Sequence, residues 1–207
     1  TGDGKDLYDL VSNFKDNFTH MNENNVESVF EIQFSDDNYG GGDGEVPNAS
    51  MGNNRAQFFA PGGIGWSDGQ LRYWVIEEFK KELDLDGNLD ERLRHSALYS
   101  GLEADFGDKT YNRDWQWGDQ DAYFRTYQRD YYRDNEDYYS QVNLRLIRYA
   151  DILLSYAEVL NELGSTAEAY QYVDRVRARA NMAPLATAYP TIGNDPDAFL
   201  DRLKMER

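Results

Sequence analysis

The feature that most constrains the fold is a pair of apolar stripes at helical spacing within residues 144–181. The first stripe steps by four and three residues through Leu146, Ala150, Leu153, Ala157 and Leu160; the second comprises Ala169, Val173, Val176 and Ala180. Gly164 lies between the stripes as a helix terminator, and Ser165 precedes Glu168 at capping-box spacing. So short a turn predicts an antiparallel helix hairpin. Its small alanines let the helices approach closely, which is typical of a tetratricopeptide-like pair.

The remaining sequence predicts shorter and less regular elements. Apolar spacing favours an amphipathic helix over 6–18 and another over 70–83 that includes Trp74 in its core stripe. Alternation over 28–35 predicts a half-buried strand with Phe30, Ile32 and Phe34 on its buried face. Residues 36–69 and 84–92 are loop-like, and 96–142 favour short strands and loops.

A last helix is predicted over 196–207, with Asp195 as N-cap and Pro196 in the first turn. The expected fold is therefore mainly α: tetratricopeptide-like helix pairs beside a small irregular α+β, loop-rich lobe. Because Thr1 opens the sequence and the last helix shows no stop signal, we expect 1–207 to be a partial domain. Its irregular, aromatic-rich part would span 6–143, and its helical part 144–207.

Charge and composition exclude several classes of function. The chain carries 21 Lys and Arg against 38 Asp and Glu, a net charge of −17. This charge disfavours binding to nucleic acid or to anionic lipid. The absence of cysteine removes disulfides, thiolate metal sites and thiol nucleophiles, and two histidines cannot form a three-histidine site. We expect no metal and no cofactor. No apolar run approaches the ~20 residues of a membrane span.

The aromatic residues supply the candidate binding site. All four tryptophans lie between residues 66 and 117. Aromatic rings can stack on an apolar face of a ligand, and polar side chains can hydrogen-bond to its polar groups. The segment 111–117 offers both kinds of group, and Trp66 on a glycine-rich loop adds another ring. The candidate ligand-binding residues are Tyr111, Arg113, Asp114, Trp115, Trp117 and Trp66. The alternative is that these rings pack beneath loops as part of the core.

Other patterns favour structural roles. Acidic side chains alternate over 84–90 as in a calcium loop, but Leu89 replaces the required glycine, so a solvated turn is favoured. Arg145, Arg148, Arg175, Arg177 and Arg179 are expected to pair with Asp151, Glu158, Glu162 and Asp174 around the hairpin. Two carboxylates at the spacing of a glycosidase are possible among so many acids, but the sequence identifies no pair.

Several segments together resemble one family. Residues 147–162 read IRYADILLSYAEVLNE and resemble a signature helix of the SusD/RagB family. Residues 174–180 resemble its next helix, 27–34 one of its strands, and 206–207 the opening of the helix that follows. Residues 90–93 resemble its Asp-Pro-Arg turn, with Glu91 in place of proline. These segments occur in the order found in the family.

The resemblance implies a SusD-like fold and a non-catalytic function. Members of this family are outer-membrane lipoproteins on the extracellular face of Bacteroidetes-type bacteria. They bind glycans and deliver them to a SusC-like TonB-dependent transporter. The resemblance therefore implies a glycan ligand, that transporter as partner, and membrane attachment only through a lipid anchor outside this sequence. A scaffold docked on such a transporter, binding a peptide or another nutrient, is the alternative.

Overall fold

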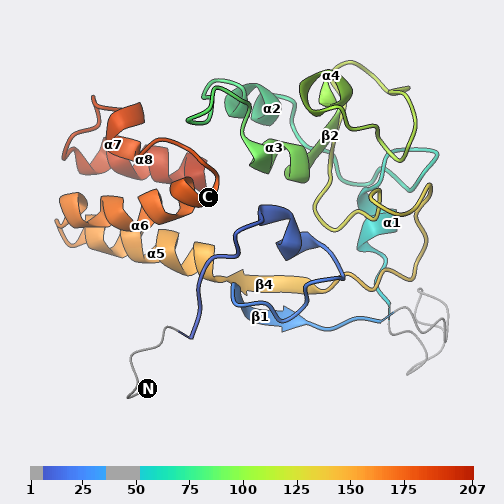
Figure 1. Ribbon diagram of the computed structural model, residues 1–207, viewed down its shortest axis with the longest axis horizontal. Helices are drawn as coiled ribbons and strands as arrows, with labels where there is room; N and C mark the ends of the chain where they lie inside the picture. Colours follow the sequence, from blue (N-terminus) through green and yellow to red (C-terminus); the bar gives the residue numbers. More distant parts are fainter. Residues whose placement is uncertain (1–6, 36–51) are drawn as a thin grey trace.

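The computed structural model describes residues 7–35 and 52–207 (Figure 1). It is mainly helical and, in these residues, has two small antiparallel sheets, as the sequence predicts. The elements in chain order are the 3₁₀ helix η1 (Phe14–Phe18), β1 (Ser28–Ile32), α1 (Arg55–Phe59), α2 (Trp74–Phe79), α3 (Glu91–Ser96), β2 (Ala97–Tyr99), α4 (Leu102–Phe106), β3 (Ala122–Phe124), β4 (Leu144–Arg148), α5 (Tyr149–Glu162), α6 (Thr166–Arg179), α7 (Leu185–Ala188) and α8 (Pro196–Glu206).

Helices α5 and α6 form the predicted hairpin, and α8 packs against both (Figure 1). Both apolar stripes are buried at their interface except Leu146, which lies in β4 and is 52% exposed. Gly164 turns the chain with a φ of +78°, where a β-carbon would be strained. The Asp195 side chain caps α8 by accepting from the backbone N–H groups of the two residues after Pro196. The predicted capping box is wrong, because the Ser165 side chain makes no cap bond.

The sheet of β1 and β4 joins the N-terminal segment to the hairpin, since β4 continues directly into α5. The predicted strand exists as β1, shorter than expected, but the prediction that Phe30 and Ile32 lie on its buried face is wrong. Phe30 and Ile32 are 54% and 41% exposed, whereas the Glu31 side chain is almost completely buried. The Arg145 guanidinium lies 3.0 Å from the Glu31 carboxylate and compensates its burial.

A second core surrounds β2 and β3, and the loops of the aromatic-rich part pack around it. Here the expected helix over 70–83 shrinks to α2, because the Leu71 backbone N–H donates instead to Ala122 at the end of β3 (2.8 Å). Trp74 is 56% exposed, so its predicted core position is wrong. Within 84–92 the polar turn is confirmed up to Asp90, which caps α3.

Two other segments differ from the sequence prediction. The helix expected over 6–18 is confined to η1 in the described residues; before it, the Val11 N–H donates to the buried Glu27 carboxylate rather than to a helical carbonyl. Of the long loop expected over 36–69, residues 36–51 lie outside the described residues, and the rest contains α1. Residues 96–142 contain the predicted short strands and loops, with α4 in addition.

Buried ion pairs connect the hairpin to the remaining segments. Glu27 receives both Arg148 and Arg179 at 2.9 Å. Arg177, on α6, bonds to Glu206 and to Glu82. The arginines therefore form structural ion pairs, as expected, but the expected partners are wrong. The five arginines named in the sequence analysis pair with acidic residues outside the hairpin, and Asp151 and Glu158 pair with Arg207. Among the described residues, no helix is long and apolar enough to cross a membrane.

Replacing Arg177 by Gln should lower the free energy of unfolding by about 3 kcal/mol or more, because two carboxylates lose a fully buried cation. Arg175→Gln is the matched control on the same helix. Its pair with Asp9 is exposed, so its cost should stay below about 1 kcal/mol. Urea unfolding followed by circular dichroism measures both. Equal losses for the two variants would contradict this account of the fold.

The pH dependence of stability should reflect the protonation of His95. Burial, together with the nearby charges of Arg125, Lys15 and Arg94, lowers the pKa of His95 from 6.5 to about 4, against the opposing effect of Asp108. The unfolded chain therefore takes up a proton that the folded chain refuses, and stability falls as the pH drops from 6.5 towards 4. His95→Gln should flatten this part of the curve by up to about 1.4 kcal/mol per pH unit. Urea unfolding at a series of pH values measures this. If the free energy of unfolding changes with pH equally in the wild type and in His95→Gln, His95 is not the group responsible.

Candidate functional site

Three exposed aromatic rings, one on α1 and two on loops, form a cluster centred on Trp66. Trp66 is 42% exposed, and its ring centroid lies 5.2 Å from that of Tyr138 and 6.4 Å from that of Phe58. Tyr138 and Phe58 are also more than a third exposed. Both pairs meet at an interplanar angle of 71°. We call Phe58, Trp66 and Tyr138 the aromatic face.

The backbone around Trp66 is fixed by α1 and the turn that follows it. The Trp66 N–H donates to the Gln57 carbonyl at 2.8 Å. The preceding residue must be glycine, because a β-carbon on Gly65 would lie 2.3 Å from that same carbonyl oxygen. The Asp68 N–H donates to the Phe58 carbonyl (3.0 Å), which places an exposed carboxylate residue beside the aromatic face.

The predicted pair Trp115 and Trp117 lies on a neighbouring loop. The two rings are in edge contact, 4.9 Å apart, and both pack against the buried Tyr123. Their indole N–H groups donate to the carbonyls of Gly118 (3.2 Å) and Gly62 (2.9 Å). The Trp117–Gly62 bond ties this loop to the one that contains Trp66. Both rings are half-buried, so they combine a packing role with a partly open surface.

The other predicted residues of 111–117 divide into buried and exposed groups. Tyr111 is completely buried, and its hydroxyl donates to the Glu136 carboxylate at 2.5 Å. Arg113 donates to the Asp134 carbonyl (2.9 Å) and the Asn135 side chain (2.8 Å). Both residues therefore hold the segment 134–136 in place. Tyr111 lies beyond the reach of a ligand at the surface.

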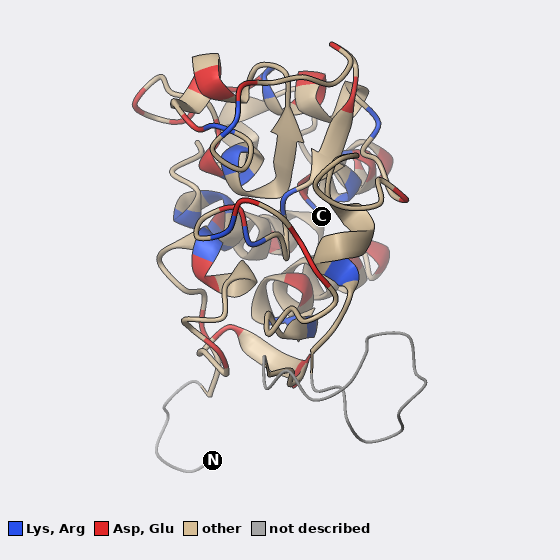
Figure 2. Cartoon of the chain, turned by 90° about the vertical axis from the view of Figure 1, so that its right-hand side faces the viewer, with Lys and Arg blue, Asp and Glu red and all other residues tan. Residues whose placement is uncertain are grey.

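Asp114 is the most exposed of the predicted residues, with a side chain 84% accessible. It pairs with Lys109 at 2.5 Å. The side of the molecule that carries these loops is shown in Figure 2, where acidic residues are spread along the outer turns. Six residues were predicted from the sequence; the structure gathers five of them at or near the surface loops and places Tyr111 beneath them.

A buried ion pair supports these loops from below. The side chains of Arg129 and Glu136 are 1% and 0% exposed and lie 2.7 Å apart. Glu136 also accepts from the Arg129 backbone N–H at 2.8 Å. Burial raises the pKa of Glu136 above its ordinary value, although Arg129 and the Tyr111 hydroxyl oppose the shift. Burial likewise raises the pKa of the Tyr111 hydroxyl, which thus remains a proton donor.

Sequence reasoning missed Phe58, Tyr138, Arg129 and Glu136. Phe58 and Tyr138 each belong to a pair of adjacent aromatic residues, and no periodicity distinguishes the exposed member from the half-buried one. Only the contact of both with Trp66 identifies them. Arg129 and Glu136 carried no signal, because both lie in a segment rich in charged residues.

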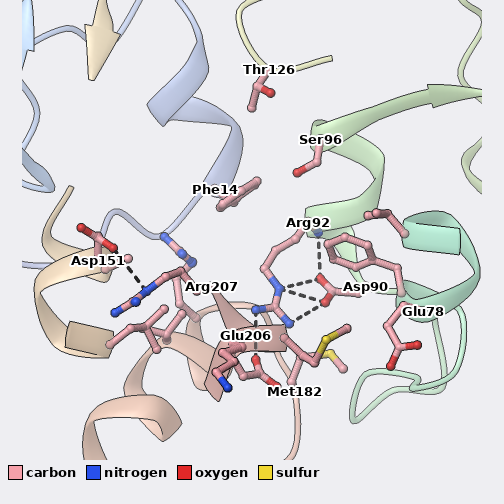
Figure 3. A pocket seen from close by; sticks show the side chains of 18 of the residues that line it. Phe14, Glu78, Asp90, Arg92, Ser96, Thr126, Asp151, Met182, Glu206 and Arg207 are labelled. Atoms are coloured by element: carbon pink, nitrogen blue, oxygen red, sulfur yellow. Dashed lines mark hydrogen bonds and ion pairs between the residues drawn. The ribbon is translucent and has the colours of Figure 1, made fainter. Parts of the chain in front are cut away.

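A cleft of about 510 Å³ lies elsewhere in the described residues, between η1, α2 and the hairpin with α8. None of the six predicted residues lines it; Trp74 does. Figure 3 shows Arg92 held between Asp90 and Glu206, and Arg207 beside Asp151. The cleft thus engages its charged groups in pairs, whereas the aromatic face leaves its rings open to solvent.

The turn over 84–90 is organised by its own hydrogen bonds. Asp84 accepts from the backbone N–H groups of Asp86 (2.9 Å) and Asn88 (2.8 Å). The bond from the Asn88 backbone is the largest cause of a lowered pKa of the Asp84 carboxyl. Over residues 7–35 and 52–207, no cluster of three or more acidic or histidine side chains has the arrangement of a metal site.

The chain was compared with known proteins. The model of the SusD family matches residues 26–207. SusD-like protein P25 of Formosa agariphila is 27% identical over 97% of this chain and 40% of its own length. A SusD superfamily protein from Bacteroides vulgatus matches with a TM-score of 0.78 and 27% identity, over 97% of this chain and 41% of its own.

A more distant structural match carries a ligand. Surface glycan-binding protein A from Bacteroides thetaiotaomicron, solved in complex with laminarihexaose, matches with a TM-score of 0.66 and 21% identity over 98% of this chain and 44% of its own. At this identity the match shows a shared fold. The chain spans about two fifths of the length of the relatives that it matches.

Tyr111→Phe should lower the free energy of unfolding by about 1–3 kcal/mol, because the buried Glu136 carboxylate loses a hydrogen bond while the ring volume is kept. Tyr138→Phe is the matched control: it also removes a tyrosine hydroxyl, but from an exposed ring, and should leave stability almost unchanged. Urea unfolding of both variants tests this difference. An unchanged midpoint for Tyr111→Phe would show that this bond contributes nothing.

Proposed function

Because the chain belongs to the SusD family, we propose that it binds glycans at the bacterial cell surface. The proposed binding surface is the aromatic face together with the adjoining Trp115 and Trp117 and the exposed Asp114. Arg113 borders this surface, and Tyr111 supports it from beneath. Ring faces stack on the C–H faces of sugars, and the nearby polar side chains bond to their hydroxyls.

The observation that carries this proposal is the aromatic face. Trp66 touches both Phe58 of α1 and Tyr138, which comes from a loop far along the sequence, and all three rings remain more than a third exposed. Clustered apolar surface left open to water is uncommon outside binding sites. Exposed Asp68 adds a hydrogen-bond acceptor beside these rings, and exposed Asp114 adds one directly before Trp115 in the chain.

The distant structural match narrows the choice of first ligand. A protein of the same fold was solved with laminarihexaose. Laminarin and its oligosaccharides are therefore the first probes for this chain, beside other uncharged and anionic polysaccharides. We expect modest affinity, in the micromolar to millimolar range at about −8 to −4 kcal/mol, because the rings form an open and hydrated surface.

Membership of the family also supports finer proposals about the whole protein. We infer that it is a non-catalytic lipoprotein of the outer membrane, facing the outside of the cell. It would present its ligand to a SusC-like TonB-dependent transporter. The separate possibility of a peptide or another nutrient as cargo is a defined outcome of the experiment that follows.

The test is retardation in native gels cast with a panel of polysaccharides. We expect laminarin or another glycan to retard the wild-type protein, and Trp66→Ala to lose most of the effect because the central ring is removed. The double variant Trp115→Ala and Trp117→Ala should lose part of it, since those rings are half-buried. Trp74→Ala is the matched control: its ring is more exposed than that of Trp66 but lies on α2 in the cleft.

The outcomes distinguish the candidate functions. Retardation that persists in both site variants would keep glycan binding and move it away from these rings. A loss in Trp74→Ala alone would move it to the cleft. No retardation by any polysaccharide would reject the proposed ligand and favour the peptide-binding scaffold.

A further inference from the structure

The segment that supplies Tyr138 to the aromatic face is anchored at both ends to the segment that supplies Trp66. The Glu136 N–H donates to the Ile64 carbonyl at 3.3 Å. Ser140 and Asn53 exchange two backbone hydrogen bonds of 2.9 Å. Between these anchors, the position of the Tyr138 ring depends on what holds residues 137 and 139.

Arg129 holds both neighbours of Tyr138. Its guanidinium donates to the Tyr139 carbonyl at 3.1 Å and to the Asp137 carboxylate at 2.7 Å. The same guanidinium donates through Nε to Glu136 at 2.7 Å. One planar group thus bonds to three of the residues between 136 and 139, and the fixed geometry of its N–H groups sets their relative positions.

Glu136 in turn fixes Arg129. Its carboxylate accepts three hydrogen bonds, from the Arg129 backbone and side chain and from the Tyr111 hydroxyl, and it is inaccessible to solvent. Tyr111 brings in the loop that carries the tryptophan pair. The loops of both parts of the proposed binding surface therefore meet at this carboxylate.

We propose that Glu136 and Arg129 are positioning residues whose buried ion pair holds the Tyr138 ring against Trp66 and thereby sets the glycan affinity of the aromatic face. The effect on affinity rests on the proposed function, whereas the effect on ring geometry does not. Stability alone does not account for the pair, because apolar side chains of similar volume stabilise a core as well or better. The hydrogen bonds from Arg129 to Asp137 and Tyr139 instead fix the position of the exposed Tyr138 ring that lies between them.

Glu136→Gln tests this proposal. Glutamine keeps the volume of the side chain but removes its charge, and its amide NH₂ must face one of the two Arg129 donors, the backbone N–H or Nε–H, that now bond to separate carboxylate oxygens. The matched control is Glu27→Gln, which also replaces a fully buried glutamate bonded to arginines, Arg148 and Arg179. Glu27 lies between η1 and the hairpin, away from the aromatic loops.

Two measurements separate positioning from stability. The indole N–H signals in a ¹H–¹⁵N spectrum of the ligand-free protein, with Trp66 assigned through Trp66→Phe, report the ring that Tyr138 contacts. We expect Glu136→Gln to shift the Trp66 signal and Glu27→Gln to leave it in place, although both lower stability. In titrations with laminarin oligosaccharides, Glu136→Gln should weaken binding by about three- to tenfold, the worth of one aromatic contact. Glu27→Gln should bind as wild type.

Each other result has a defined meaning. An unmoved Trp66 signal with wild-type affinity in Glu136→Gln overturns the proposal, and so does equal weakening in both glutamate variants. Absence of binding by the wild type rejects the proposed function, while the Trp66 signal still decides the positioning role. Should Glu136→Gln fail to fold, Arg129→Lys replaces it: lysine keeps the charge but lacks the planar group, and the same shift of the Trp66 signal is expected.

Discussion

Glu27 lies in the interior of the molecule, where it accepts from the backbone of Val11, the side chain of Asn17 and the guanidinium groups of Arg148 and Arg179. These bonds join the N-terminal segment, the start of α5 and the end of α6 at one carboxylate. The arginines at 177 and 145 make comparable connections to Glu82, Glu206 and Glu31. Because a lone buried charge is costly, each such pair requires its distant segments to be present together.

The aromatic loops depend on the same kind of interaction. Regular secondary structure contributes little there, since only short elements occur between residues 97 and 143. Here the buried ion pair of Arg129 and Glu136 holds several loops together through hydrogen bonds, as a sheet or a helix does elsewhere in the molecule. An acidic protein with few long elements can thus present an ordered set of exposed rings. The proposed glycan-binding surface follows from ionic contacts in the interior as much as from the rings themselves.

The parts of the fold that were predictable from the sequence are those fixed by local interactions. The hairpin of α5 and α6, the turn at Gly164 and the cap at Asp195 each depend on residues within a few positions of one another. The strand β1 was found, but its buried face was reversed, because alternation of apolar residues does not reveal that Glu31 meets Arg145 from a distant strand. The short length of α2 likewise depends on the remote pairing of Leu71 with Ala122.

The candidate site shows the same limit. Composition and spacing identified Trp66, Trp115 and Trp117, and the structure brings their loops together through the bond from Trp117 to Gly62. Tyr111 and Arg113 were selected for their polar groups, yet those groups bond to residues 134–136 of the protein. Tyr138 could not be distinguished from Tyr139, because the contact with Trp66 that separates them spans more than seventy residues of sequence.

The angle between the rings of the aromatic face has a consequence for the shape of a ligand. Trp66 and Tyr138 are inclined at 71°, not coplanar. A saccharide that is a flat ribbon, with successive sugars facing the same way, lies flush on one of these rings and meets the other at its edge. A chain that coils turns its sugar faces from one unit to the next and can follow the inclination of the two rings. Under the proposed function, the aromatic face would therefore favour coiled chains over flat ones, and would distinguish two polysaccharides built from the same monosaccharide through different linkages.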